Sequence, residues 1–144
     1  MIFLYDENAS NDHLVIKGEN FKYLIKVRRH KVNDELCFRN QKIPEMLYRY
    51  KISSIESKKI VCDLIEQNKS IVEAGKKLHV GWCIIDVKSV ERVLATLNEI
   101  GVDKISFIYC KRSQRNFKMD LKRFERILLS SNQQCGRSTL MEFE

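Results

Sequence analysis

Two basic segments are the first residues of this sequence whose type and spacing suggest a chemistry. Between Asn20 and Asn33 there are five lysines and arginines and no acidic residue. Between Lys111 and Arg126 there are seven basic residues and two acidic ones. A solvated face is the ordinary explanation of one such cluster, but two clusters in a chain of net charge +7 favour binding to a polyanion such as RNA or DNA.

Signatures of common catalytic sites are missing from the sequence. There is no GxGxxG, P-loop, HExxH or GxSxG motif, and the three histidines lack metal-ligand spacing, so no metal site is expected. Five cysteines form no CxxC pair, and we therefore expect ordinary reduced thiols rather than a disulfide framework or a zinc site. Arg112 and Arg137 follow a predicted strand and a predicted helix. They are the candidates for a reaction site because α/β folds usually place ligands at such exits.

The first half of the chain consists of short β-type runs around one helix. Phe21, Leu24, Ile25 and Arg28 fall at helical spacing and predict a helix from Glu19 to Arg29. Several short strands with one helix indicate a small barrel or a compact sheet. Polar residues 67–77 are the predicted linker. The strands are expected at residues 2–5, 13–16, 35–38, 46–53 and 59–65.

The second half changes to an alternation of strands and helices. Residues 78–85 form a continuous apolar run, which is typical of a strand covered on both faces. A helix carrying Val90, Leu94 and Leu97 on one face should end at Gly101, before a second buried strand at 104–109. A second helix should run from an Asp120 cap to Gly136, and residues 138–143 could begin a further strand. This β-α-β-α order predicts parallel strands with a right-handed crossover. No segment is long and apolar enough to span a membrane, and the start of the chain lacks a secretory signal pattern.

Three segments resemble motifs of one enzyme family. YLIKVRRHKVND at residues 23–34 resembles the pattern H-L-x-x-V-L-R-x-x-x-G-D of the RsmE-type ribosomal RNA uridine-N3 methyltransferases, a branch of the SPOUT superfamily. Residues 97–105, with Glu99, are similar to that family's K-A-T-E-L-G-V-x-x-I segment, and residues 134–137, with Gln134, are similar to its Q-S-G-R turn. Glu99 and Gln134 have no assigned role, and helix termination and packing is the alternative for both. The chain departs from the patterns at Tyr23, Arg28, Asn33, Thr96 and Met141.

The resemblance implies both a fold and an activity. Residues 1–72 would form a PUA-like RNA-binding β-barrel, and residues 73–144 would form the first β-α-β-α part of a SPOUT (α/β knot) domain. Such enzymes are homodimers that transfer a methyl group from S-adenosylmethionine to N3 of a uridine in 16S rRNA of the small ribosomal subunit, in the cytoplasm. RNA contacts are expected from four residues, which are Lys26, Arg28, Arg29 and Lys31.

The family's cofactor pocket is carried by segments that this sequence does not contain. Neither G-P-E-G-G nor L-G-x-x-I-L-R-x-E-T-A occurs. We therefore expect the chain to be the N-terminal two-thirds of such an enzyme and to bind no cofactor by itself. Two alternatives stay open: a non-catalytic RNA-binding module with a vestigial α/β half, and a DNA-binding regulator, for which a helix-turn-helix pattern is missing.

Overall fold

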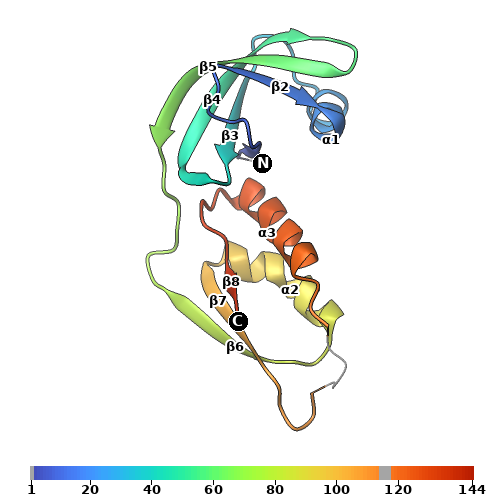
Figure 1. The fold of residues 1–144 in the computed structure, drawn as a ribbon, viewed down its shortest axis with the longest axis vertical. Helices are drawn as coiled ribbons and strands as arrows, with labels where there is room; N and C mark the ends of the chain where they lie inside the picture. Colours follow the sequence, from blue (N-terminus) through green and yellow to red (C-terminus); the bar gives the residue numbers. More distant parts are fainter. Residues whose placement is uncertain (1, 114–117) are drawn as a thin grey trace. The chain divides into compact units, whose positions relative to one another are not determined.

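The computed structural model describes residues 2–113 and 118–144, which form two compact units (Figure 1). The β-sheet unit comprises Phe3–Ile71, and the α/β unit comprises Ile2 together with Val72–Glu144. The predicted linker at 67–77 begins later than expected, because the preceding strand continues to Lys69. Among the residues described, no helix is long and apolar enough to cross a membrane.

The β-sheet unit is built on a curled five-stranded sheet (Figure 1). Its strands follow the order β1-β3-β4-β5-β2, with β1 parallel to β3 and every other pair antiparallel. Two irregularities between β4 and β5 interrupt their pairing, and such bulges bend a sheet. All five predicted strands are present, and the last two are longer than expected. Their bounds are β1 Leu4–Tyr5, β2 His13–Lys17, β3 Glu35–Asn40, β4 Ile43–Ile55 and β5 Lys59–Lys69.

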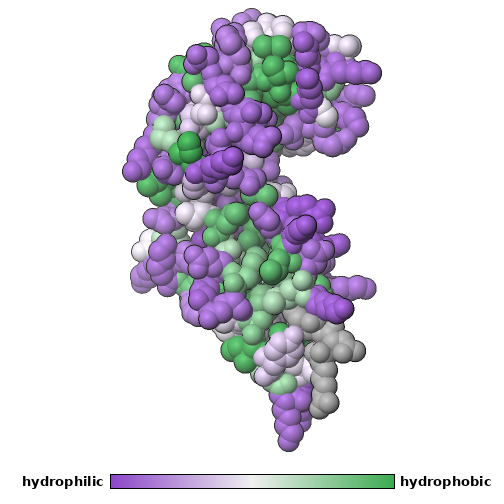
Figure 2. Space-filling view, in the orientation of Figure 1, coloured by the Kyte–Doolittle hydropathy of each residue, from purple (hydrophilic) through white to green (hydrophobic). Residues whose placement is uncertain are grey.

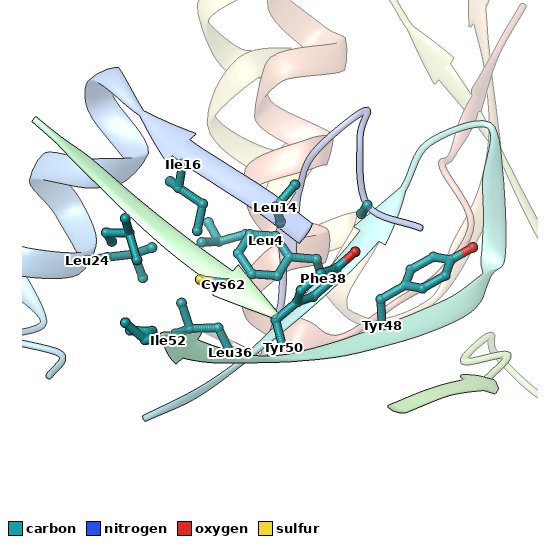
Figure 3. Packing of buried hydrophobic residues seen from close by; sticks show 12 residues of the cluster. Leu4, Leu14, Ile16, Leu24, Leu36, Phe38, Tyr48, Tyr50, Ile52 and Cys62 are labelled. Carbon is teal, nitrogen blue, oxygen red and sulfur yellow. The ribbon is translucent and has the colours of Figure 1, made fainter. Parts of the chain in front are cut away.

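The inner side of this sheet carries the core of the unit (Figure 3). Alternate residues of β4 are buried, including Tyr48, Tyr50 and Ile52, because side chains alternate across a strand. The Tyr50 hydroxyl is satisfied, since it donates to the Asn11 carbonyl at 2.7 Å and accepts from the Ser10 amide at 3.1 Å. The helical segment that follows β2 packs against this core.

The helix expected at 19–29 is present but is not uniform. It begins as α1 (Gly18–Lys22) and continues as a π-helical segment, η1 (Tyr23–Val27), with the Arg28 amide bonded to the Tyr23 carbonyl at 2.9 Å. Leu24 is fully buried in the core of the sheet. The π-helical segment therefore keeps Leu24 in the core. Segments of π-helix often occur at functional sites.

The α/β unit has three parallel strands in the order β6-β7-β8. Its elements are β6 Leu78–Cys83, α2 Val87–Glu99, β7 Val102–Ile108, α3 Leu121–Cys135 and β8 Glu142–Phe143. The predicted β-α-β-α order is confirmed, and the strand expected from residues 138–143 is β8. Asp120 caps α3 by accepting from the Arg123 amide at 3.0 Å, while Gly101 and Gly136 follow their helices with φ of 93° and 86°.

The prediction that residues 78–85 are covered on both faces is wrong. Strand β6 lies at the edge of the sheet, and Leu78 and Ile85 are 46% and 62% exposed. The core of the unit lies between α2, α3 and one face of the sheet, to which β7 contributes Val102 and Ile105. We call the opposite side of β6 and β7 the open face; it carries His79, Cys83, Lys104, Ser106 and Ile108. The apolar run thus predicted a strand correctly, but it did not predict how many faces of that strand are buried.

Apolar side chains reach the surface of the α/β unit (Figure 2). The most exposed of them include Ile85, Ile100 and Tyr109. Trp82, the single tryptophan of the chain, is partly buried and packs against the core of this unit. Its fluorescence will therefore report on the α/β unit alone.

Candidate functional site

The first candidate contact surface is the segment Lys26–Lys31, which we call the basic loop. Its four predicted RNA-binding residues all have exposed side chains. The chain leaves η1 after Val27, and Arg29 has a φ of 60°, which turns the backbone away from the helix. Among the described residues, none of these four cations takes part in a salt bridge that would occupy it. The loop thus presents unpaired positive charges to solvent.

The backbone of the basic loop is held by its neighbours. Asp34 accepts from the Lys31 amide at 3.0 Å, and its carboxylate lies 3.0 Å from Nδ1 of His30. The Lys31 amide is the main reason that the pKa of Asp34 is lowered, with His30 second. Farther on, the Asn33 amide donates to the Ile52 carbonyl at 2.9 Å, and the Ile52 amide donates to Asp34 at the same distance. A fixed backbone lowers the ordering cost of binding a ligand.

The second pair of candidates, Arg112 and Arg137, does not share one site. Arg112 is exposed and follows the carboxyl end of β7, whereas Arg137 contacts Val102 and Asp103 at its amino end. Seven residues of extended chain separate these ends, a span of about 20 Å. The reason is topological: a helix that connects parallel strands runs back along the sheet, so its exit lies at the amino edge. Only the carboxyl edge is the usual ligand side.

Arg137 is buried, with 5% of its surface exposed, and its guanidinium is fully engaged. Nη1 donates to the carbonyls of Asn98 and Val102 at 3.2 and 2.6 Å. Nη2 donates to Asp103 Oδ1 at 3.0 Å, and Nε donates to Thr139 Oγ1 at 3.2 Å. These bonds join the end of α2, the start of β7 and the segment after α3. Arg137 therefore positions the elements of the α/β unit.

Asp103 makes the stability of this unit sensitive to acid. Its pKa is lowered, first by a hydrogen bond from the Leu78 amide (2.9 Å) and then by the charges of Lys77 and Arg137. A carboxyl group with a lowered folded-state pKa stabilises the fold above its unfolded pKa, and this contribution is lost as the pH falls through the folded value. We expect Asp103→Asn to lower the urea midpoint of unfolding at pH 6. Below pH 3.8, the ordinary pKa of an aspartate side chain, the midpoint of the variant should fall less with further acidification than that of the unchanged protein. Trp82 fluorescence measures both, and an unchanged acid dependence would contradict the assignment.

The two motif residues without an assigned role, Glu99 and Gln134, lie in the same groove. Together with six other residues of α2 and α3 they line a cavity of about 440 Å³, which we call the α2–α3 groove. The side chains of Glu99 and Gln134 are exposed, and no hydrogen bond to either occurs in the described part of the chain. The groove residues are Ala95, Glu99, Arg123, Arg126, Ile127, Ser130, Ser131 and Gln134.

Groups in the α2–α3 groove offer both hydrogen-bond donors and acceptors. Glu99 offers a carboxylate, Gln134 an amide and Ser130 a hydroxyl. Arg123 is paired with Glu91 at 2.6 Å, and Arg126 donates a long hydrogen bond of 3.4 Å from Nε to the Lys122 carbonyl. A guanidinium beside amide and carboxylate groups can contact a phosphate and the edge of a base.

Ser131, a residue of this groove, belongs to a buried polar network that sequence reasoning missed. Asn98 Nδ2 donates to Ser131 Oγ at 3.0 Å and to Asn132 Oδ1 at 2.7 Å, and Asn132 in turn donates to the Thr139 carbonyl at 3.0 Å. All three are almost fully buried. The signal was present in the spacing, because Asn98 continues the series Val90, Leu94 on the inner face of α2. A polar residue at such a position predicts a partner on the facing helix.

Two cavities of the α/β unit lie away from the side of its sheet where ligands usually bind. Besides the α2–α3 groove there is a cavity of about 230 Å³, lined by Asn98, Gly101, Arg137 and their neighbours at the amino edge of the sheet. Neither cavity lies at the carboxyl ends of β6 and β7, where an α/β sheet usually binds its ligand. Among the residues that the structure covers, no group of three potential metal ligands is found either.

Sequence relatives cover all or nearly all of this chain. Ribosomal RNA small subunit methyltransferase E of Helicobacter pylori (strain ATCC 700392 / 26695) is 40% identical, across 100% of this chain and 65% of the relative. The enzyme of the same name from Buchnera aphidicola is 26% identical across 96% of this chain and 56% of the relative. The chain thus spans 65% of the length of the Helicobacter protein and 56% of the length of the Buchnera protein. The resemblance to RsmE-type methyltransferases drawn from the three motifs is confirmed.

Solved structures share the fold over the same extent. Ribosomal RNA small subunit methyltransferase E from Neisseria gonorrhoeae, bound to S-adenosyl methionine, superposes with a TM-score of 0.74 at 16% identity, covering 100% of this chain and 60% of that one. A putative methyltransferase from Legionella pneumophila in complex with the same cofactor gives 0.73 at 20% identity, covering 99% and 61%. A family model described as an RNA methyltransferase domain matches residues 72–144. This chain belongs to the RNA methyltransferase domain family.

Proposed function

We propose that this chain is part of a ribosomal RNA methyltransferase that transfers a methyl group from S-adenosylmethionine to N3 of a uridine in 16S rRNA. The observation that carries the proposal is the family match over residues 72–144, together with a basic loop whose four cations form no salt bridge within the described part of the chain. The β-sheet unit corresponds to the PUA-like RNA-binding part, and the α/β unit to the first portion of a SPOUT domain. The enzyme would act as a homodimer in the cytoplasm.

RNA binding is the step to which the described residues contribute. The basic loop supplies phosphate contacts, which position an RNA without reading its sequence. The α2–α3 groove supplies a second surface, on which Arg126 contacts a phosphate and the exposed Glu99 and Gln134 hydrogen-bond to the edge of a base. Methyl transfer to N3 further requires removal of its imino proton and alignment of the nitrogen with the methyl group.

Cofactor binding is expected to need residues beyond these. Titration of the 144-residue protein with S-adenosylmethionine in a calorimeter should give no binding in the micromolar range. The reason is that neither of the two cavities lies at the carboxyl edge of the β6–β7–β8 sheet. Binding of micromolar affinity would contradict this part of the proposal, and the enzyme from Neisseria gonorrhoeae, which was solved with S-adenosyl methionine bound, is the positive control.

Loss of one modified nucleoside is the direct test of the activity. In cells that carry this gene, its disruption should remove 3-methyluridine from 16S rRNA, as measured by mass spectrometry of the digested RNA. Reintroduction of the intact gene should restore it. If the nucleoside persists after disruption, the alternative of a non-catalytic RNA-binding module is favoured, because such a module would bind RNA without changing its modification.

A further inference from the structure

Two cysteines that are far apart in the sequence lie together on the open face of the α/β unit. Cys83 is the last residue of β6, and Cys110 follows β7 by two residues. Their sulfur atoms are 2.8 Å apart, and the Cys110 thiol donates to the Cys83 sulfur. Both side chains are exposed. Parallel pairing brings the two segments together, because Cys83 is paired with Ile108, which lies two residues before Cys110.

The backbone around both cysteines is fixed. The Ile84 amide donates to the Ile108 carbonyl at 3.0 Å, which extends the strand pairing beyond Cys83. Residues 110–113 form a turn in which the Ser113 amide donates to the Cys110 carbonyl and the Cys110 amide donates to Ser113 Oγ, each at 2.9 Å. The backbone on which both cysteines stand is therefore held by hydrogen bonds on either side.

The other three cysteines differ from this pair in their exposure. Cys62 is buried, and burial raises its pKa to about 12, so it stays protonated and unreactive. Cys37 and Cys135 are half-buried. The pKa of Cys110 is also raised, chiefly by its hydrogen bond to Cys83.

We propose that Cys83 and Cys110 are a modification site that forms a reversible intramolecular disulfide when the protein meets a hydroperoxide. The Cys83 thiol loses its proton to water, and the thiolate attacks one peroxide oxygen. The O–O bond breaks, Cys83 becomes a sulfenic acid, and the hydroxide or alkoxide that leaves takes up a proton to become water or an alcohol. The Cys110 sulfur then attacks the sulfenic sulfur. The S–S bond forms, hydroxide leaves, and it takes up the Cys110 proton as water. Two electrons pass from the two sulfurs to the peroxide, and a dithiol reductant reverses the change by exchange.

The disulfide would fasten the 110–113 turn to the end of β6. Arg112 is the third residue of that turn, so the bond would limit the positions that this exposed cation can take. The disulfide itself does not depend on the proposed function, because its formation is measured on the protein without RNA or cofactor.

Peptide mapping tests the site directly. The reduced full chain is treated with hydrogen peroxide, alkylated, and digested with trypsin, which places Cys83 in peptide 78–88 and Cys110 in peptide 105–111. We expect these two peptides to be linked, with a mass about 2 Da below their sum because two hydrogens are lost. The chain should lose two of its five titratable thiols and regain them with dithiothreitol.

Variants distinguish this pair from general oxidation. Cys83→Ser and Cys110→Ser should each abolish the link, whereas Cys37→Ser should leave it unchanged. Far-ultraviolet circular dichroism and Trp82 fluorescence confirm that each variant is folded. The proposal is overturned if all five cysteines are still alkylated after peroxide treatment. It is equally overturned if the linked peptides contain other cysteines or join two chains.

Discussion

Replacing Lys26, Arg28, Arg29 and Lys31 together by glutamine is expected to weaken the binding of a 16S rRNA fragment by several hundred-fold at about 0.1 M salt. Each phosphate contact to a single strand contributes roughly 0.7 to the slope of log affinity against log salt concentration, so four lost contacts lower that slope by about 3. Fluorescence anisotropy with a labelled RNA over a series of salt concentrations measures both quantities. The change in slope is the sharper readout, because it counts lost ion contacts.

A matched control separates this surface from net charge. Lys42, Lys51, Lys58 and Lys69 are exposed on the same unit, and replacing them by glutamine removes the same charge. This control should keep most of the affinity and the slope. Equal losses in the two quadruple variants would contradict a specific role for the basic loop. In the same titration Arg126→Gln tests the α2–α3 groove, and an unchanged affinity would remove the groove from the RNA surface.

Arg137→Met is expected to destabilise the α/β unit by about 2–4 kcal/mol, the largest effect of a single substitution that we predict. The methionine has a similar length but leaves the Val102 and Asn98 carbonyls and the Asp103 carboxylate without their donor. Lys77 lies 3.5 Å from Asp103, and that carboxylate is 18% exposed, so part of its charge remains compensated. The expected loss is therefore smaller than for a fully buried ion pair.

Urea unfolding followed by Trp82 fluorescence measures this change. The tryptophan lies in the α/β unit, so the transition reports that unit even if the β-sheet unit unfolds separately. Arg112→Met is the control, because this arginine is exposed in a turn and its replacement should shift stability by less than about 0.5 kcal/mol. Equal urea midpoints for the two variants would show that the buried hydrogen bonds of Arg137 contribute nothing measurable.

Local patterns predicted the elements of this chain well. The strands of the first half and the β-α-β-α order of the second half were found close to their expected positions, because periodicity and end signals act over a few residues. Asp120 and Gly136 bound α3 as expected, since capping depends on the local backbone alone. The three motifs, read in order, also pointed to the family, although each is short.

What the sequence by itself determined is the set of elements, the excess of positive charge and the family resemblance, all of which depend on neighbouring residues or on composition. Only the tertiary structure decided which distant residues meet. It placed Arg112 and Arg137 at opposite ends of β7, gathered Glu99 and Gln134 in one groove, and brought the sulfurs of Cys83 and Cys110 to 2.8 Å. The physical reason is that strand register and helix packing, which set these contacts, depend on the chain as a whole. The spacing of two residues along the sequence therefore does not predict whether they are in contact.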